Sequence, residues 1–356
     1  MEEKLEQTED KEYAEYLKSF IKTKGTFYRK IPNMRGIVDF DYVDENSSEN
    51  MLSGYSVKYC VRANEMFFRD LINQIRKNPN LSYGLCYTNE EIVAGDFPNY
   101  FSVIMKEPSN LFSIETEVFA SRILSYFGTP VAYNRRIDKA IPHYGTSNYL
   151  MSIDMIRKNE KLVLLNEIVP FLTHIDIGKF DRQGVKNTLD LVGEYLEIYL
   201  TENDINFTSQ EIEDYKKFLA ASLLERVMLL GDNDLRNGNA GILIDFKNKS
   251  FRALPNFDME KSFSSMISQS RFEHLKEFYE LYPDVYDDFI MKMLGLFDST
   301  KKGELVYENI ARKAIREESI ANSVMYGLYN NAAEIWDETM RFRKSYGISD
   351  AKEKGE

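Results

Sequence analysis

One stretch, residues 229–262, constrains this chain of 356 residues more than any other: LLGDNDLRNGNAGILIDFKNKSFRALPNFDMEKS. Asp232 and Asp234 fall in a loop with three asparagines, and Asp258 follows further along the stretch. Carboxylate oxygens and amide carbonyls are ligands that Mg²⁺ prefers, and a further Asp can accept the proton of an attacking hydroxyl. The residue types therefore predict a site for Mg²⁺ and a nucleoside triphosphate.

The predicted elements around this loop support that placement. A capping-box pattern at Thr208 opens a helix whose apolar residues recur at helical spacing, and Gly231 ends it. Residues 242–244 and 251–254 then predict a hairpin with FKNKS as its turn. Because the loop precedes the hairpin and Asp258 follows it, we expect their carboxylates to meet in space.

A plainer interpretation is a turn after a helix, in which Asn and Asp side chains cap backbone groups. Against it, Asp234 and Asn239 stand five residues apart, as do the catalytic Asp and metal-binding Asn of kinases. The segments GDNDLRNGNAGIL and LPNFDMEKS resemble the catalytic and metal-binding segments of the HipA-like Ser/Thr kinases. The resemblance implies that Asp234 is the catalytic base and that Asn239 and Asp258 bind metal. Arg236 stands where that family usually has His, and its fork of donors could brace the loop instead.

The N-terminal part of the chain carries a candidate phosphate loop, SGYSVK, between β-like runs. A Gly among small hydroxyl residues lets backbone N–H groups approach phosphate, although an ordinary turn has the same composition. The HipA-like family has a loop of the form S/A-G-x-x-x-K. The resemblance implies ATP-binding roles for Ser53, Gly54, Ser56 and Lys58. Either serine is also a candidate for autophosphorylation.

A β-prone run, YFSVIM, ends at Lys106, and a helical pattern follows it. A Lys in that position is commonly a solvated strand end, or it neutralises the α- and β-phosphates while a helix Glu holds it. The same order of strand, Lys, loop and helix is found in the HipA-like family. The resemblance implies an ion pair between Lys106 and Glu117, which we expect in the first turn of the helix, with Glu115 as the alternative partner.

Residues 148–156 predict a strand that resembles the crossing strand and hinge of the same family. There, backbone groups near Asp154 and Ile156 would hydrogen-bond adenine, although a plain sheet strand has the same pattern. After this point apolar residues recur almost wholly at helical spacing, which predicts a mainly helical remainder.

These features, in this order, predict an α+β protein with the two-lobed, protein-kinase-like fold of the HipA-like family. We expect a helical extension over residues 1–25 and a small β-rich lobe over residues 26–155, which holds the phosphate loop and a helical insertion. A mainly helical lobe should follow over residues 156–348, and a tail over residues 349–356.

Composition excludes several other classes. The net charge of −12 and the lack of a Lys/Arg stripe argue against direct nucleic-acid binding. Two cysteines, Cys60 and Cys86, do not make a disulfide framework, and the three histidines lack metal-ligand spacing. No run approaches the roughly 18 apolar residues of a membrane span, and the acidic N-terminus is unlike a signal peptide. We therefore expect a cytoplasmic protein with no membrane contact.

The predicted function is ATP- and Mg²⁺-dependent transfer of a phosphoryl group to a Ser or Thr hydroxyl of a protein, autophosphorylation included. Two alternatives stay open: an ATP-binding pseudokinase, and an enzyme of the same fold that acts on a small molecule or lipid head group or transfers a nucleotidyl group. Members of the HipA-like family often belong to toxin–antitoxin pairs. The resemblance therefore implies a small DNA-binding antitoxin as a partner.

Overall fold

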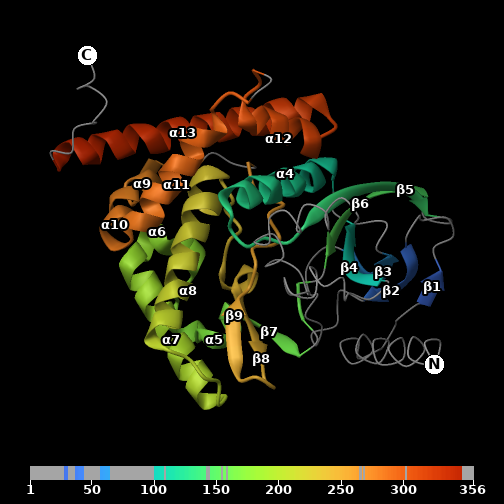
Figure 1. Ribbon diagram of the computed structural model, residues 1–356, viewed down its shortest axis with the longest axis horizontal. Helices are drawn as coiled ribbons and strands as arrows, with labels where there is room; N and C mark the ends of the chain where they lie inside the picture. Colours follow the sequence, from blue (N-terminus) through green and yellow to red (C-terminus); the bar gives the residue numbers. More distant parts are fainter. Residues whose placement is uncertain are drawn as a thin grey trace. The chain divides into compact units, whose positions relative to one another are not determined.

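A computed structural model describes most of the C-terminal two thirds of the chain and several strands before it. The described residues are 28–30, 37–43, 57–64, 100–107, 110–141, 145–153, 155–157, 159–263, 267, 269–300 and 303–346. Helices predominate beside two antiparallel sheets, so the expected α+β class is confirmed (Figure 1). Among the described helices, none combines the length and apolar character that crossing a bilayer requires.

Contacts divide the chain into two compact units. The first comprises Met1–Ile114 and Tyr133–Asp154, and the second comprises Glu115–Ala132 and Met155–Glu356. The expected N-terminal helix, the C-terminal tail and the insertion beyond Asn64 lie outside the described residues, and the expected lobe boundaries stay predictions.

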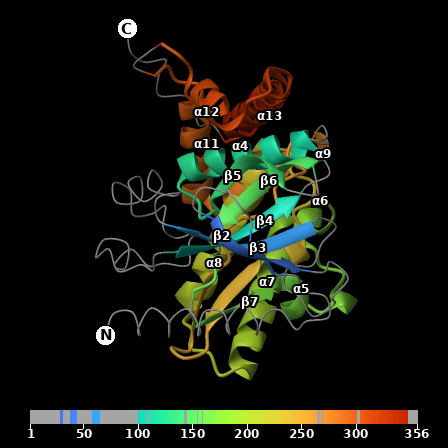
Figure 2. The ribbon, with the colours of Figure 1, turned by 90° about the vertical axis from the view of Figure 1, so that its right-hand side faces the viewer.

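The first unit contains a six-stranded antiparallel sheet of order β1-β2-β3-β4-β6-β5. Its strands are β1 (Tyr28–Lys30), β2 (Ile37–Val43), β3 (Val57–Asn64), β4 (Tyr100–Glu107), β5 (Asn134–Ile141) and β6 (Gly145–Ile153). Figure 2 shows β2, β3, β4 and β6 side by side. The register sets Lys58 opposite Lys106, and Lys106 opposite Leu150 on the other flank of β4.

The second unit contains a three-stranded antiparallel sheet of order β7-β8-β9. Its strands are β7 (Glu160–Leu164), β8 (Gly241–Asp245) and β9 (Ser250–Ala253). The predicted hairpin is confirmed as β8 and β9, and its turn is built by Asp245, whose Oδ1 accepts from the N–H groups of Lys247 and Asn248 at 2.9 Å each. The third strand, β7, was not predicted, because EKLVL is too short to separate from a loop by its pattern.

Helices form most of the remaining second unit, and the first of them begins at the end of the first unit's segment Met1–Ile114. They are α4 (Leu111–Phe127), α5 (Leu165–Ile168), α6 (Phe180–Gln183), α7 (Val185–Glu202), α8 (Ser209–Ser222), α9 (Gln269–Phe272), α10 (Leu275–Leu281), α11 (Pro283–Leu296), α12 (Val306–Ala314) and α13 (Glu318–Ser345). The predicted capping box of α8 is confirmed: Thr208 Oγ1 accepts from the N–H of Glu211, whose carboxylate accepts from the N–H of Thr208 at 2.7 Å. Gly231, at φ 64°, ends this helical stretch as expected.

The core of the second unit follows the predicted apolar stripes. On α7 the buried positions include Val185, Leu189, Val192 and Leu196, and the stripe continues through Leu200. Since α7 packs against α8, these side chains lose contact with water. The removal of apolar surface from water is the main force that holds such helices together.

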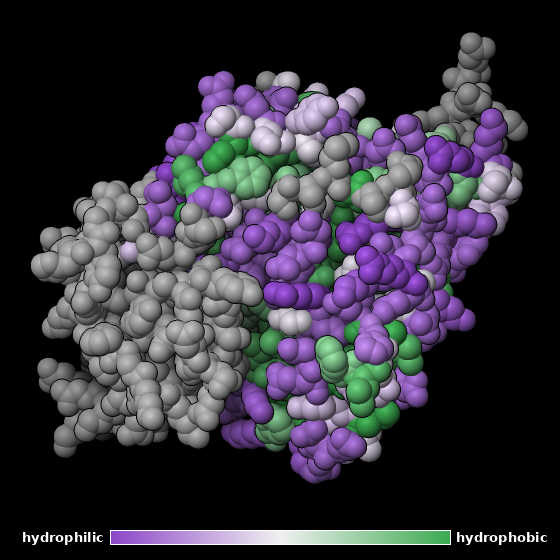
Figure 3. Space-filling view, turned by 180° about the vertical axis from the view of Figure 1, so that it is seen from behind, coloured by the Kyte–Doolittle hydropathy of each residue, from purple (hydrophilic) through white to green (hydrophobic). Residues whose placement is uncertain are grey.

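On the face seen from behind, hydrophilic side chains prevail in the described part of the chain (Figure 3).

The start of α4 differs from the prediction. The helix begins at Leu111, four residues before the expected start near Glu115, because Asn110 caps it. Oδ1 of Asn110 accepts from the N–H of Ser113 at 2.8 Å, which satisfies a donor that the first turn leaves unpaired. The expectation that Glu117 lies in the first turn is therefore wrong, and it lies in the second turn.

Gly241→Ala is expected to lower the free energy of unfolding by about 1 to 3 kcal/mol. A Cβ at this position would lie 2.2 Å from the carbonyl oxygen of Val163, so β7 and β8 would have to separate. Gly238→Ala is the matched control, because a Cβ there meets nothing within 4 Å. Urea unfolding of both variants measures the difference, and equal stabilities would contradict the close packing of β7 on β8.

Candidate active site

A buried ion pair lies beneath the Asn-rich loop. Arg226 and Asp232 are fully buried, and Nε and Nη2 of Arg226 donate to Oδ2 of Asp232 at 2.9 and 2.6 Å. A buried pair of charges is tolerated when the remaining donors also find acceptors. Here Nη1 donates to Oδ1 of Asn256 at 3.3 Å, and Nη2 also donates to the carbonyl of Asp258 at 3.4 Å. One guanidinium therefore connects the Asn-rich loop to the turn that carries Asp258.

Arg226 lies in a π-helical segment, Leu223–Leu229, that continues α8. The N–H of Leu230 donates to the carbonyl of Glu225 at 3.0 Å, and the N–H of Asp232 donates to the carbonyl of Arg226 at 2.9 Å. π-helical turns are rare in proteins, and many of those that occur lie at functional sites. Arg226 and Asp232 are therefore joined both by a backbone hydrogen bond and by their side chains, and these bonds fix the start of the loop.

Asp234 and Asn239 are brought together by the loop that carries them. Oδ1 of Asp232 accepts from the N–H of Asp234 at 3.1 Å, and Nδ2 of Asn239 donates to the carbonyl of Asp234 at 2.9 Å. Because Nδ2 is used there, Oδ1 is the atom of the Asn239 amide that could ligate a cation.

Asn237 anchors the loop to the segment before α6. Its Nδ2 donates to the carbonyl of Ile175 at 2.7 Å, and its Oδ1 accepts from the N–H of Ile177 at 3.0 Å. The same segment passes very close to the loop, since a Cβ added to Gly178 would lie 1.8 Å from the carbonyl oxygen of Leu235. Asn237 therefore has a structural role, and only glycine fits at position 178 without a backbone shift.

Asp258 adopts a left-handed backbone conformation, at φ 55°. Residues other than glycine adopt it at some cost, and Asp and Asn do so most readily. The turn is held in place on its N-terminal side, where the N–H of Asn256 donates to the carbonyl of Pro130 at 2.9 Å and its carbonyl accepts from Ala132 at 2.8 Å. Met259 is fully buried on the other side. Such strained residues cluster at functional sites.

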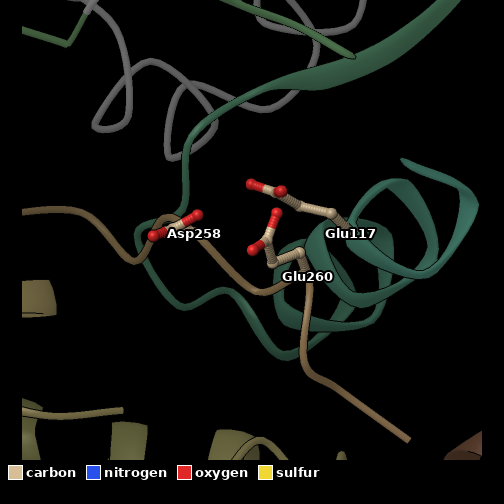
Figure 4. Close-up of side chains that lie close together, drawn as sticks. All are labelled: Glu117, Asp258 and Glu260. Carbon is tan, nitrogen blue, oxygen red and sulfur yellow. The ribbon is translucent and has the colours of Figure 1, made fainter. Parts of the chain in front are cut away.

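Glu117 of α4 lies beside Asp258 and Glu260, and carboxylate oxygens of the three residues lie within 4.8 Å of one another. Figure 4 shows their side chains converging from the helix and from the turn after β9. Carboxylates this close repel one another unless a cation lies near them, and either a Lys ammonium or Mg²⁺ would meet that need. All the donor atoms are hard oxygens, so the group is chemically suited to Mg²⁺.

The pKa of the Asp234 carboxyl is raised from its ordinary value. Partial burial is the main cause, and the carboxylates of Asp232 and Asp258 act in the same direction. The guanidinium of Arg236, with Nε 3.7 Å from Oδ1 of Asp234, opposes the rise, and Lys261 also opposes it. A carboxylate with a raised pKa is a better proton acceptor in catalysis near neutral pH.

The other predicted nucleotide-binding residues belong to other parts of the chain. The ones outside the described residues are Ser53, Gly54, Ser56 and Asp154. Lys58 and Lys106 pair across β3 and β4 in the first unit, and Ile156 is half-buried in the second unit. Their ATP-binding roles and the ion pair between Lys106 and Glu117 stay predictions.

Glu115, the alternative partner for Lys106, binds the start of α13. Its carboxylate accepts from the N–H groups of Arg316 and Glu317 at 3.1 and 3.3 Å, directly before that helix. A carboxylate is favourable there because it satisfies unpaired N–H groups at the positive end of the helix dipole. Glu115 therefore has a structural role, while Glu117 points to the Asp258 turn.

Three residues of the site were not identified from the sequence: Arg226, Asn256 and Glu260. Arg226 carries the clearest signal, because it interrupts the apolar run LLERVMLL just before the acidic loop. A charged residue in a helix that is otherwise buried requires a buried partner, and the nearest carboxylate beyond the run is Asp232.

No protein-family model matches the chain, and no curated protein sequence matches it significantly. Among solved structures, the chain is similar to the Helicobacter pylori proinflammatory kinase CtkA, at 15% identity and a TM-score of 0.46 over 71% of this chain and 91% of that one. It is also similar to HipA from a complex of the Shewanella oneidensis MR-1 toxin–antitoxin system with HipB and operator DNA. That match has 10% identity and a TM-score of 0.41, over 65% of this chain and 57% of that one.

Both structures are of the kind that the sequence resemblance names, a CtkA kinase and HipA. This chain spans just over half the length of the second one. At such identities and TM-scores, function has to be argued from the residues of the site.

Arg226→Leu is expected to lower the free energy of unfolding by about 3 to 5 kcal/mol, because it leaves the Asp232 carboxylate buried without its partner. Arg236→Leu removes an exposed guanidinium of the same loop and should change stability by about 0.5 kcal/mol at most. Urea unfolding followed by the fluorescence of Trp336, the single Trp, measures both variants. A small effect of Arg226→Leu would show that the pair does not hold the loop.

Proposed function

We propose that this chain is a phosphotransferase of the HipA-like kinase type, which moves the γ-phosphoryl group of ATP to a Ser or Thr hydroxyl of a protein. The observation that carries the proposal is a network of hydrogen bonds that join the side chains of Arg226, Asp232 and Asn239 to the backbone of two segments that bear three polar side chains. Those side chains are Asp234, Asn239 and Asp258. Their order and spacing are those of the catalytic and metal-binding residues of kinases.

Asp258 and Asn239 would hold the metal. A carboxylate and an amide carbonyl supply hard oxygen ligands, and the neighbouring Glu117 and Glu260 add negative charge that favours a divalent cation. When bound, Mg²⁺ would supply positive charge that offsets the negative charge of the phosphoryl group during transfer.

Asp234 would orient the acceptor hydroxyl and take its proton. As the hydroxyl oxygen bonds to the γ-phosphorus, the bond from that phosphorus to the β,γ-bridging oxygen breaks, and the hydroxyl proton passes to a carboxylate oxygen of Asp234. Arg236 lies within ion-pair distance of this carboxylate and favours its ionised form. In this role the guanidinium would replace the His that the family usually has.

Nucleotide binding would use the remaining predicted residues of a two-lobed, kinase-like fold. Lys106 would neutralise the α- and β-phosphates with Glu117 holding its side chain, and Lys58 would lie in the phosphate loop with Ser53, Gly54 and Ser56. Backbone groups near Asp154 and Ile156 would bind adenine.

The partners follow from the same proposal. Because the Shewanella HipA structure contains HipB and operator DNA, we include a small DNA-binding antitoxin as a partner, in the cytoplasm, beside the protein substrate.

Incubation of the protein with γ-labelled ATP and Mg²⁺ separates the alternative functions. Label on protein Ser or Thr supports a protein kinase, label on a small molecule or lipid supports the related enzyme, and ATP binding without transfer supports a pseudokinase.

Asp258→Asn and Asp234→Asn are each expected to reduce phosphoryl transfer by at least about 10²-fold, since one loses a metal ligand charge and the other the proton acceptor. ATP binding should weaken only in Asp258→Asn, because Asp234 would face the acceptor hydroxyl. Asp337→Asn, on the exposed face of α13, is the matched control and should keep full activity. Mass spectrometry of added phosphate gives the readout, and transfer at the unmodified rate by either site variant would refute the assigned roles.

Arg236→Ala is expected to move the acidic limb of the pH–rate profile to higher pH, by less than about one unit because the ion pair is exposed. The direction follows from the charges: Asp234 works as a carboxylate, activity falls as pH drops through its pKa, and the nearby guanidinium lowers that pKa. Arg236→Lys keeps the positive charge and should leave the limb in place. A shift to lower pH in Arg236→Ala would show that Arg236 does not stabilise the carboxylate.

A further inference from the structure

A cavity of about 630 Å³ opens in the second unit between the end of α4, one face of α8 and the start of α11. None of the residues proposed for catalysis or metal binding lines it. A volume of this size holds a small organic molecule rather than a single ion. It is therefore a possible binding site separate from the phosphotransfer chemistry.

Glu225 lines this cavity and is the residue that sets its chemistry. The side chain is 4% exposed, and its Oε1 accepts from Oγ1 of Thr129 at 2.7 Å. Its Oε2 is buried and has no hydrogen-bond partner among the described residues. A buried carboxyl oxygen without a donor costs free energy, and a ligand that supplied a donor would recover it.

The charged groups around Glu225 leave the cavity acidic. The lining residues that carry charge are Glu213, Asp214 and Lys217 on α8, and Asp284, Asp288 and Lys292 on α11. Counting Glu225, five carboxyl groups face two ammonium groups. Lys292 is already bound to Asp288 at 2.5 Å, which leaves Lys217 as the other cation of the lining. A ligand with a positive charge fits this balance, and one with a negative charge does not.

Aromatic rings supply part of the remaining surface. Phe127, Phe218, Tyr282 and Phe289 line the cavity. Rings of this kind bury an apolar stem, and their faces attract an ammonium or guanidinium group.

We propose that the cavity binds a small organic cation, an ammonium or guanidinium group on an apolar stem, which pairs with the carboxylate of Glu225. This inference does not depend on the proposed kinase function, since no residue is shared between the two sites.

Binding should be linked to proton release. Burial raises the pKa of Glu225 from its ordinary value to about 8; the Thr129 hydroxyl and Lys292 oppose the rise and Asp288 adds to it. Below pH 8 the free protein therefore holds a proton that a cationic ligand must displace. The affinity should fall about tenfold for each pH unit below 8 and level off above it, while an alkylammonium ligand stays charged throughout.

Titration calorimetry with 2-phenylethylamine and with agmatine, at pH 6, 7 and 8, tests the proposal, and 2-phenylethanol serves as the neutral probe. We expect at least one of the two cations to bind, with about one proton released per ligand below pH 8. Glu225→Gln keeps the acceptor for Thr129 and should weaken binding at pH 8 at least tenfold and abolish its pH dependence. Glu334→Gln, exposed on α13, is the matched control and should bind as the parent does.

Three results would overturn the proposal: no binding of either cation at millimolar concentration, unchanged binding in Glu225→Gln, or binding of the alcohol as tight as that of the amine. Thermal unfolding shows that Glu225→Gln is folded and gives an independent check. The raised pKa destabilises the folded parent as pH rises from about 4.5 to about 8. The variant should therefore match the parent at pH 4.5 and exceed its stability above pH 8.

Discussion

The buried ion pair of Arg226 and Asp232 is the interaction on which the candidate site depends. Each charge alone would be costly in the core, so the two residues need each other, and the donors of Arg226 that Asp232 does not use require further acceptors. Those acceptors are Asn256 and the carbonyl of Asp258. The requirement to satisfy one guanidinium thus fixes two segments that lie on either side of the β8–β9 hairpin. The Asn-rich loop and the turn of Asp258 are therefore positioned by the same side chain, which explains how half-buried carboxylates can be held near one another despite their repulsion.

The surroundings of a carboxyl group, rather than its residue type, decide its role in this unit. Asp232 is neutralised by a buried Arg, and Glu115 satisfies N–H groups at the start of α13. Asp234 is partly buried beside other carboxylates, which raises its pKa and suits it to accept a proton. Glu225 is fully buried with one hydroxyl donor, so its pKa rises much further. The four acidic residues therefore have four different environments, which their residue type alone does not show.

The features that the sequence predicted correctly are those that depend on residues close together in the chain. The capping box at Thr208, the β8–β9 hairpin and the helix end at Gly231 depend on residues a few positions apart, and the sequence displays those directly. The spacing of Asp234 and Asn239 is local in the same sense, because the Asn239 amide binds the Asp234 carbonyl within one loop. The expected first-turn position of Glu117 failed for a local reason as well, since the cap at Asn110 was overlooked.

Contacts between distant positions could not be predicted in this way. Arg226 meets Asn256 across 30 positions, and Glu115 meets Arg316 across 201. Neither pair produces a periodic pattern in the sequence. Each contact depends on how the helices pack in three dimensions, which the sequence pattern does not give. What the sequence does carry is the requirement itself: a charged residue within a buried apolar run has to find a partner, and few are in reach. Glu225 and Arg226 stand side by side in that run, and they differ in outcome: Arg226 has acceptors for its donors, whereas Oε2 of Glu225 has no hydrogen-bond partner among the described residues.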